Sequence, residues 1–327
     1  MNIREAVLSA LKDKQGEWLS GEELSELLNV SRTTVWKHVK ALQAEGYEVE
    51  SSSKKGYRLM VPPDLLSTDE VCPGLSTEVF GQGDYFYYQE IDSTNKAARR
   101  LASDGYPEGT VVVAEKQLEG RGRRGRSWYS PVRQGIYLSI ILRPALPLKE
   151  ISRISLLTAV ALAETLETEL NLPARIKWPN DILVNNRKIA GILSEAVTDM
   201  DGIEYIVVGM GINVNNPAED FPDDFRIIPT SVFKENLHTV SRINILQILL
   251  ERMEYHYFKL LQGDFTFTLD KGRRLSLVIG QQVRLDTMNG FVEGLAIDID
   301  ESGFLLVKDD KGGVQTIMSG EIDILPA

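Results

Sequence analysis

The chain has 327 residues, more than one hydrophobic core usually serves, so we expect two or three domains. Hydrophobic residues make up 43% of the sequence and charged residues 25%, as in a globular protein, and no apolar run approaches the roughly 18 residues of a membrane span. The N-terminus lacks the basic and apolar regions of a signal peptide, which predicts a cytoplasmic protein. One cysteine and three scattered histidines exclude a cysteine-rich zinc site and argue against a serine triad.

The formal net charge of −11 conceals two basic segments. Residues 31–60 contain six basic and three acidic residues, and residues 120–149 contain seven basic and no acidic residues. Local charge, rather than the total, decides whether a protein attracts nucleic acid or phosphate. The sequence therefore predicts two separate sites for phosphate-bearing partners.

Three helical segments and two strand-like segments follow one another in the first sixty residues. Apolar residues at helical spacing predict the helices, and Ser20 lies three residues before Glu23, the spacing of a capping box at the start of the second. A basic segment, 51–56, joins the two strands. The expected helices are 2–13, 21–28 and 32–46, and the expected strands are 47–50 and 57–60.

This order resembles a winged helix-turn-helix domain, in which the third helix lies in the major groove and a basic hairpin reaches backbone phosphates. A small helical interaction module with an ordinary solvated face is the alternative interpretation. The residues expected to contact DNA lie at the start of the third helix and in the hairpin, and they are Ser31, Arg32, Thr33, Thr34, Lys37, Lys54 and Lys55.

From residue 84 onward, short β-rich runs alternate with helical segments, which indicates an α+β body with a mainly antiparallel mixed sheet. The expected strands are 85–89, 110–116, 136–142, 182–184, 189–195 and 205–209. The expected helices are 95–102, 151–170 and a helical region at 241–275, with a loop at 218–240. Alternating strands and turns over 277–325, one turn at Asn289-Gly290, predict a small SH3-like β-barrel.

The domain boundaries follow from this pattern and from the helix- and strand-breaking run Val61-Pro62-Pro63-Asp64. The expected domains are 1–62 for the winged domain, 63–83 for a linker, 84–275 for the central domain and 276–327 for the barrel.

The most informative stretch is a glycine- and arginine-rich segment at 120–128. Its glycines fit a dinucleotide-binding pattern and its length fits a Walker loop, but no helix follows, Pro131 opposes one, and the Walker lysine is replaced by Arg126. Four arginines on such a loop instead suit a mobile cover that wraps a polyphosphate with backbone amides and guanidinium groups. A disordered basic surface loop is the alternative.

Four further motifs accompany this arginine loop. They are Asp-Ser-Thr-Asn at 92–95, Lys-Trp-Pro-Asn-Asp at 177–181, Arg-Lys-Ile-Ala-Gly-Ile-Leu-Ser-Glu at 187–195, and Gly-Met-Gly-Ile-Asn-Val-Asn at 209–215. Together the five motifs resemble the biotin protein ligase family over essentially the whole chain. The winged start is similar to the bifunctional subgroup that also represses biotin genes.

The resemblance implies an enzyme that forms biotinyl-5′-AMP from biotin and ATP with Mg²⁺. Biotin would then pass to a lysine of the biotin carboxyl carrier protein of acetyl-CoA carboxylase or a similar carboxylase. It also implies ligand-linked homodimerisation and binding to operator DNA, with repression of biotin synthesis and transport genes. The central domain would be the catalytic one.

The resemblance also implies roles for individual residues. The implied catalytic residues are Lys188, Arg123 and Asp181, with Asp181 the candidate Mg²⁺ ligand. The implied biotin-binding residues are Ser93, Thr94, Asn95, Gln117, Gly120, Arg121, Arg123, Lys188, Gly191, Gly209 and Gly211. The implied nucleotide-binding residues are Arg123, Arg126, Trp128, Asn180, Lys188 and Asn213.

Each of these residues, taken alone, has a structural alternative. Ser93 and Thr94 precede a helix and could cap it, the glycines could form turns, and Asp181 could cap a turn. Either Lys188 or Asp181 could assist deprotonation of the acceptor lysine. The arginine loop departs from the family pattern at Ser127, where a lysine is expected, so one basic contact is in doubt.

Two other functions fit part of the sequence. A transcription factor could use an inactive ligase domain as a biotin sensor, and a ligase for a related acid such as lipoate would share the catalytic fold. Retention of Lys188 and of the complete arginine loop argues against the sensor, and the arginine-rich loop favours biotin over lipoate.

Overall fold

A computed structural model describes residues 2–14, 16–60, 64–198, 202–217, 221, 226–287 and 290–325 of the chain. Contacts within the chain divide it into two compact units, Met1–Leu65 and Leu66–Ala327. Each unit encloses its own buried hydrophobic side chains.

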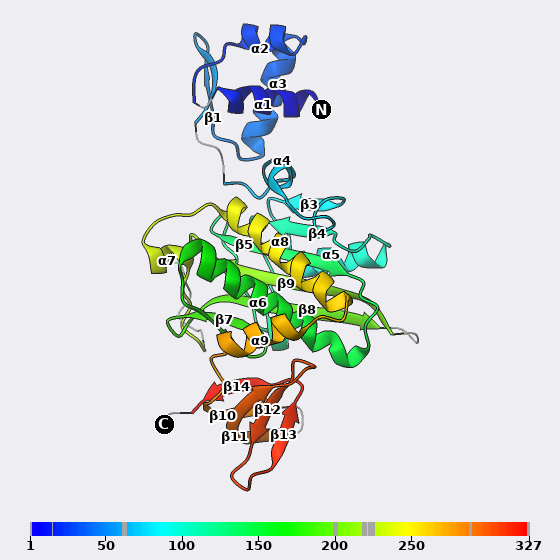
Figure 1. Cartoon of the computed structure of the whole chain (residues 1–327). Coiled ribbons are helices and arrows are strands. Elements are labelled where there is room, and N and C mark those ends of the chain that lie inside the picture. Colours follow the sequence, from blue (N-terminus) through cyan, green and yellow to red (C-terminus); the bar gives the residue numbers. More distant parts are fainter. Residues whose placement is uncertain are drawn as a thin grey trace. The chain divides into compact units, whose positions relative to one another are not determined.

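The first unit contains three helices and a two-stranded hairpin (Figure 1). Helix α2 begins with the predicted capping box, in which the Ser20 and Glu23 side chains each accept a hydrogen bond from the other residue's backbone N–H. The order of elements confirms the predicted helix, helix, helix, hairpin arrangement. The elements are α1 (Ile3–Asp13), α2 (Gly21–Leu27), α3 (Arg32–Ala44), β1 (Val49–Ser52) and β2 (Gly56–Leu59).

The second unit is built on a seven-stranded sheet in the order β3-β4-β5-β9-β8-β7-β6. Among the described strands of this sheet only β3 and β4 run parallel, which confirms the predicted mainly antiparallel mixed sheet. The strands are β3 (Tyr85–Tyr88), β4 (Val111–Ala114), β5 (Gly135–Leu142), β6 (Ala174–Lys177), β7 (Asp181–Val184), β8 (Arg187–Thr198) and β9 (Ile203–Asn213).

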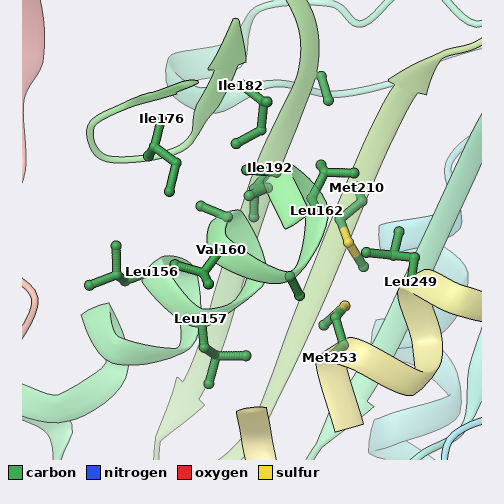
Figure 2. Close-up of a cluster of buried hydrophobic side chains, with 14 of the residues drawn as sticks. Leu156, Leu157, Val160, Leu162, Ile176, Ile182, Ile192, Met210, Leu249 and Met253 are labelled. Atoms are coloured by element: carbon green, nitrogen blue, oxygen red, sulfur yellow. The ribbon is translucent and has the colours of Figure 1, made fainter. Parts of the chain in front are cut away.

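Helices pack on both faces of this sheet. On one face, α6 (Ile151–Leu170) and α8 (Arg242–Leu261) bury the main core, where Val160 and Leu162 of α6 lie near Ile192 and Met210 of the sheet (Figure 2). On the other face, the shorter helix α5 (Thr94–Ser103) packs through alanines against a smaller apolar cluster. The candidate site described below lies on the α5 face.

Three details of the second unit differ from the sequence predictions. Strand β6 was not predicted, because four residues are too few to establish a strand period. The helical region at 241–275 divides near Gly263, whose φ of +81° favours glycine, into α8 and α9 (Thr266–Leu275). Helix α7 (Val232–Asn236), capped by Ser231, lies within the stretch predicted to be loop, of which residues 218–220 and 222–225 fall outside the described residues.

Part of the stretch expected to be a linker, 63–83, packs with the second unit. It contains the short helices α4 (Thr68–Val71) and η1 (Cys72–Gly74). The backbone N–H of Leu66 donates to the buried carboxylate of Glu115 at 2.8 Å, and the Leu66 carbonyl accepts from Tyr85 Oη at 2.7 Å. The polypeptide is therefore anchored to the sheet as soon as it enters this unit.

A five-stranded antiparallel sheet in the order β13-β12-β11-β10-β14 ends the chain. It is fastened to the rest of the unit by Trp178 Nε1, which donates to the Gly303 carbonyl at 3.1 Å, and by Arg153, which donates to the Glu301 carbonyl at 2.7 Å. β13 and β14 lie at the two ends of the strand order, so closure of the sheet into a barrel stays a prediction. The turn expected at Asn289-Gly290 lies partly outside the described residues. The strands are β10 (Gln282–Thr287), β11 (Gly290–Ile299), β12 (Leu305–Lys308), β13 (Val314–Ile317) and β14 (Glu321–Ile324).

Within the described ranges, no helix combines the length and the apolar composition that crossing a membrane requires.

Candidate active site

One pocket on the α5 face brings together residues from all five motifs, including the arginine loop. It is lined by every residue implied to bind biotin or nucleotide except Gly120, and it also includes Asp181. These residues come from the N-terminus of α5, the segment after β4, the arginine loop, strands β7 to β9 and the turn before β7. Segments up to about 120 positions apart in the sequence therefore form one site.

Glycines on the central strands make room for larger side chains at this pocket. A Cβ atom on Gly211 would lie 2.3 Å from the indole nitrogen of Trp128, and one on Gly209 would lie 1.8 Å from Asn95 Oδ1. Real Cβ atoms do not approach other atoms so closely, so Trp128 and Asn95 depend on these glycines.

A β-bulge in β8 determines which way Lys188 points. Strands β7 and β8 pair regularly as far as Ala190, but Leu183 then pairs with Lys188 and leaves Ile189 as an extra residue. Side chains alternate between the two faces of a strand, so the extra residue brings Lys188 to the same face as Gly191. Ile189 is fully buried in the main core.

Lys188 is held at the pocket wall by a carboxylate and an aromatic ring. Its Nζ lies 2.6 Å from Asp181 Oδ1 and 5.4 Å from the ring centroid of Trp128. Both side chains of the ion pair keep some exposure, 26% for Lys188 and 18% for Asp181. A fixed cation in this position can reduce the repulsion between two anionic reactants.

The Ser-Thr-Asn motif and Gln117 form a hydrogen-bond network beside α5. The backbone N–H and the hydroxyl of Thr94 donate to Gln117 Oε1 at 2.9 and 3.2 Å, and Gln117 Nε2 donates to Ser130 Oγ at 3.0 Å. Asn95 Nδ2 donates to Glu195 Oε2 at 2.8 Å. Gln117 thus keeps one amide N–H for another partner.

Ser139, which the sequence interpretation missed, lies at the centre of this network. It is fully buried on β5, and its hydroxyl lies 2.9 Å from Thr94 Oγ1 and 2.7 Å from Asn95 Oδ1. The signal that could have revealed it is a single serine among the aliphatic and aromatic residues of the run 136–142.

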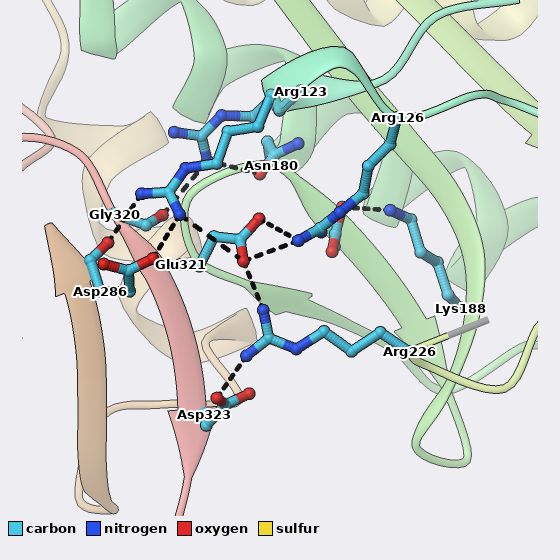
Figure 3. A network of polar contacts seen from close by, with 11 residues as sticks. Arg123, Arg126, Asn180, Lys188, Arg226, Asp286, Gly320, Glu321 and Asp323 are labelled. Atoms are coloured by element: carbon cyan, nitrogen blue, oxygen red, sulfur yellow. Dashed lines mark hydrogen bonds and ion pairs between the residues drawn. The ribbon is translucent and has the colours of Figure 1, made fainter. Parts of the chain in front are cut away.

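The arginine loop is a compact turn tied to the C-terminal sheet (Figure 3). Arg124 pairs with Asp286 at 2.6 Å and Arg126 pairs with Glu321 at 2.5 Å. Arg123 donates to Asn180 Oδ1 at 3.0 Å and to the Gly320 carbonyl at 3.4 Å. These contacts order the loop, in contrast to the alternative of a disordered basic surface segment.

Glu321 forms ion pairs with arginines from two segments of the chain. Besides the arginine loop, Arg226 pairs with Glu321 and with Asp323. Burial acts to raise the pKa of Glu321, but the hydrogen bond and charge of Arg126, with the charges of Arg226 and Arg124, outweigh burial and hold the pKa below its ordinary value. Sequence reasoning missed these acidic partners because none belongs to a recognised motif.

The two implied nucleotide-binding asparagines are also hydrogen-bonded to the protein. Asn180 Nδ2 donates to the Ile192 carbonyl at 2.9 Å, and buried Asn213 donates to the Thr230 carbonyl at 3.0 Å. Both asparagines therefore join neighbouring segments at the pocket wall.

The described residues contain no group of three or more His, Cys, Asp or Glu side chains placed to hold a metal ion. Mg²⁺ commonly takes one or two protein carboxylates together with substrate phosphates and water. Asp181 suits that role as a single protein ligand, although its Oδ1 is paired with Lys188 here.

The residues expected to contact DNA lie on α3 and the hairpin of the first unit. Ser31 caps α3 by accepting from the Thr34 backbone N–H at 3.1 Å, and Arg32 pairs with Glu22 at 2.6 Å. The remaining candidates are at least partly exposed, and they are Thr33, Thr34, Lys37, Lys54 and Lys55.

The sequence interpretation also missed two tryptophans in the first unit. Trp36 is 53% exposed on α3, on the same helix as the DNA-contact candidates. Trp18 lies beneath the hairpin, with Lys55 Nζ 5.6 Å and the Arg58 guanidinium 4.8 Å from its ring centroid. The cationic groups of Lys55 and Arg58 thus make cation–π contacts with the Trp18 ring.

Comparison with known proteins matches all three parts of the chain. The family model described as biotin/lipoate A/B protein ligase family matches residues 87–213, an HTH domain model matches residues 4–58, and a biotin protein ligase C terminal domain model matches residues 278–325. Bifunctional ligase/repressor BirA of Bacillus spizizenii is 40% identical over 98% of both chains, and BirA of Escherichia coli is 30% identical over 95% of this chain and 94% of its own. The chain belongs to the bifunctional biotin ligase/repressor family.

Solved structures of biotin protein ligases share the fold of the second unit. The ligase from Aquifex aeolicus in complex with biotin and ATP has a TM-score of 0.64 and 28% identity, and the match covers 75% of this chain and 100% of that one. This member of the bifunctional family thus combines a biotin ligase domain with a helix-turn-helix repressor domain.

Proposed function

We propose that the pocket activates biotin with ATP to biotinyl-5′-AMP and then passes biotin to a lysine of a biotin carboxyl carrier protein. The observation that carries this proposal is the ion pair between Lys188 and Asp181 at 2.6 Å. Lys188 also faces the ring of Trp128, for which glycines on the sheet leave room. The bound biotin and ATP of the Aquifex aeolicus relative support the choice of substrates.

In the first step, a biotin carboxylate oxygen attacks the α-phosphorus and pyrophosphate leaves. Both reactants are anions, so Lys188 lowers their repulsion and stabilises charge in the transition state. Arg123 and Arg126 neutralise phosphate charge from the loop. Mg²⁺ would supply further charge neutralisation, with Asp181 as its protein ligand.

The network around Ser139 orients the biotin end of the pocket. Ser93, Thr94 and the remaining amide N–H of Gln117 offer neutral polar groups, which suit a ureido ring that has two N–H donors and a carbonyl. Arg121 and the loop backbone from Gly120 cover this end.

In the second step, the acceptor lysine attacks the acyl carbonyl of the adenylate and AMP leaves. Positioning of the amine and exclusion of water account for most of the rate. Lys188 lies 2.6 Å from Asp181 at the pocket wall, a position that suits it to stabilise the leaving phosphate.

The first unit binds operator DNA through the outer face of α3 and the hairpin, and ligand binding favours a homodimer that places two such units on one operator. Sedimentation with and without biotin and ATP tests the dimer. A chain that stays monomeric at every ligand level contradicts ligand-linked dimerisation while leaving the ligase chemistry untouched.

The chemistry is tested by pyrophosphate release with ATP and Mg²⁺, comparing biotin with lipoate. Release is expected with biotin and is expected to fall at least about 100-fold in Lys188→Ala and Arg123→Ala, since each removes a charge from the transition state. The partly exposed Lys259, on α8 and outside the pocket, provides the matched control Lys259→Ala. Biotin binding without release would identify a sensor, and release with lipoate alone would contradict biotin as substrate.

A further inference from the structure

Lys177 lies at the end of β6, on the sheet face that carries the pocket. Antiparallel pairing aligns Lys177 with Asp181, Asp181 with Gly191, and Gly191 with Gly211. Residues directly opposite each other on neighbouring strands point to the same face of a sheet. Lys177 is therefore the outermost member of a row that crosses the floor of the pocket, and it lines that pocket.

Several cations of the pocket are already paired with carboxylates. Lys188 pairs with Asp181, Arg126 with Glu321, and Arg226 with both Glu321 and Asp323. Anionic ligands must compete with these carboxylates for the cations. The ammonium group of Lys177, in contrast, has no hydrogen bond or ion pair with any residue that the structure describes.

The charges near Lys177 come from four side chains. Burial lowers the pKa of Lys177, and the positive charges of Arg226 and Lys188 lower it further, against the opposing effect of Asp181 and Asp323. The ammonium is thus an incompletely compensated charge in a partly desolvated position. An anion placed beside it would stabilise the charged form.

We propose that Lys177 binds the phosphate chain of ATP on the pyrophosphate side of the bond that breaks. The proposal rests on the ATP-dependent activation described above. In that step an oxygen of the biotin carboxylate bonds to the α-phosphorus, the bond to the bridging oxygen breaks, and its electron pair leaves with pyrophosphate. Lys188 serves the carboxylate and the α-phosphate, so a second lysine is needed where charge accumulates on the leaving group.

The test is the kinetics of adenylate formation in the full-length Lys177→Met variant. Methionine keeps most of the apolar stem and removes the charge. The KM for ATP is expected to rise about 10- to 100-fold, the range for losing one charge-assisted contact, with the KM for biotin unchanged. Competition by AMP, which lacks the outer phosphates, is expected to stay at the wild-type level. Lys259→Met is the matched control and should leave all of these values unchanged.

A second variant separates loss of charge from loss of structure. Lys177→Arg keeps the positive charge, so it is expected to restore most of the ATP affinity even where Lys177→Met lowers the melting temperature. An Arg variant as weak in ATP binding as the Met variant would overturn the proposal, because charge would then not be the relevant property.

The remaining outcomes distinguish this proposal from the proposed function. A wild-type chain that forms no biotinyl adenylate refutes the activation reaction itself. A folded Lys177→Met variant with the wild-type KM for ATP overturns only the role of Lys177. The role of Lys177 is also overturned if the Lys177→Met variant forms the adenylate normally but fails to transfer biotin to an amine. That outcome would instead make Lys177 a proton acceptor in the second step.

Discussion

Trp128 is the residue against which three glycines of the site pack, two against its side chain and one against its backbone. A Cβ atom would lie 2.3 Å from its indole nitrogen at Gly211, 3.1 Å from its ring at Gly191 and 2.5 Å from its carbonyl oxygen at Gly120. Its buried indole N–H has no hydrogen-bond partner among the described residues. The space that Trp128 occupies therefore explains why these three positions are glycine.

Replacing Gly211 by alanine should displace the indole. We expect the KM for ATP to rise at least about tenfold and the free energy of unfolding to fall by about 1–3 kcal/mol, the usual range for overpacking. Steady-state adenylate formation and urea unfolding measure the two effects. Gly83→Ala is the matched control, because a Cβ there meets nothing within 4 Å. Wild-type ATP affinity in Gly211→Ala would contradict the packing role of Trp128.

Ser139 offers a second test at the scale of one residue. Removing its hydroxyl leaves Thr94 and Asn95 without their shared partner, so Ser139→Ala should raise the KM for biotin about tenfold and leave the KM for ATP unchanged. The control is Thr158→Val, which removes another fully buried hydroxyl, on α6 and away from the pocket. Equal increases in both KM values would indicate general destabilisation rather than an effect on biotin.

Among the elements, the β1–β2 hairpin depends on close packing at its turn. Gly56 has a φ of +96°, and a Cβ there would lie 2.2 Å from the Leu19 carbonyl oxygen. The same region forms the backbone bridge between Leu19 and Tyr57. The positions of Lys54 and Lys55 are therefore set by a glycine that packs against the segment before α2.

Gly56→Ala should weaken DNA binding without affecting adenylate formation, because it displaces the hairpin of the first unit only. Binding to a pool of randomised duplexes at fixed salt measures the first effect, and pyrophosphate release measures the second. Gly105→Ala, in the second unit, introduces a similar backbone strain at φ +88° with nothing within 4 Å, and it should change neither. DNA affinity equal to wild type in Gly56→Ala would argue against a role for the hairpin.

At the scale of the second unit, the C-terminal sheet supplies carboxylates that hold the arginine loop. Since the pKa of Glu321 lies below its ordinary value of 4.5, its ionised form stabilises the fold. That contribution is complete above the ordinary pKa and is lost as the pH falls through the lower pKa of the folded state. The loop and this sheet are thus coupled by charge.

Glu321→Gln should therefore be less stable than wild type at pH 7, with a difference that disappears at strongly acidic pH. Urea unfolding across the pH range measures the difference, and amide hydrogen exchange should become faster over residues 121–127. The control is Glu293→Gln, which affects a pair with Arg284 at 3.4 Å on the same sheet but away from the loop. A stability difference that persists unchanged at acidic pH would contradict the ionic contribution.

Much of the architecture could be predicted before the structure. The capping box at Ser20, the alternating sheet segments and the five motifs depend on neighbours a few positions away, and those signals are local. Prediction fails for strand β6, because four residues are too few to show a strand period. It also fails for the acidic partners of the arginine loop, because they lie far from the loop in the sequence.

The sequence by itself determined most of the order of elements, the family and the set of residue types available for chemistry, because periodicity, caps and motifs are written in consecutive residues. Only the tertiary structure decided how those residues are used. The bulge at Ile189 turns Lys188 toward the pocket, Ser139 joins Thr94 to Asn95, and Glu321 orders the arginine loop. Each of these depends on strand register or on pairs far apart in the chain, which local patterns do not specify.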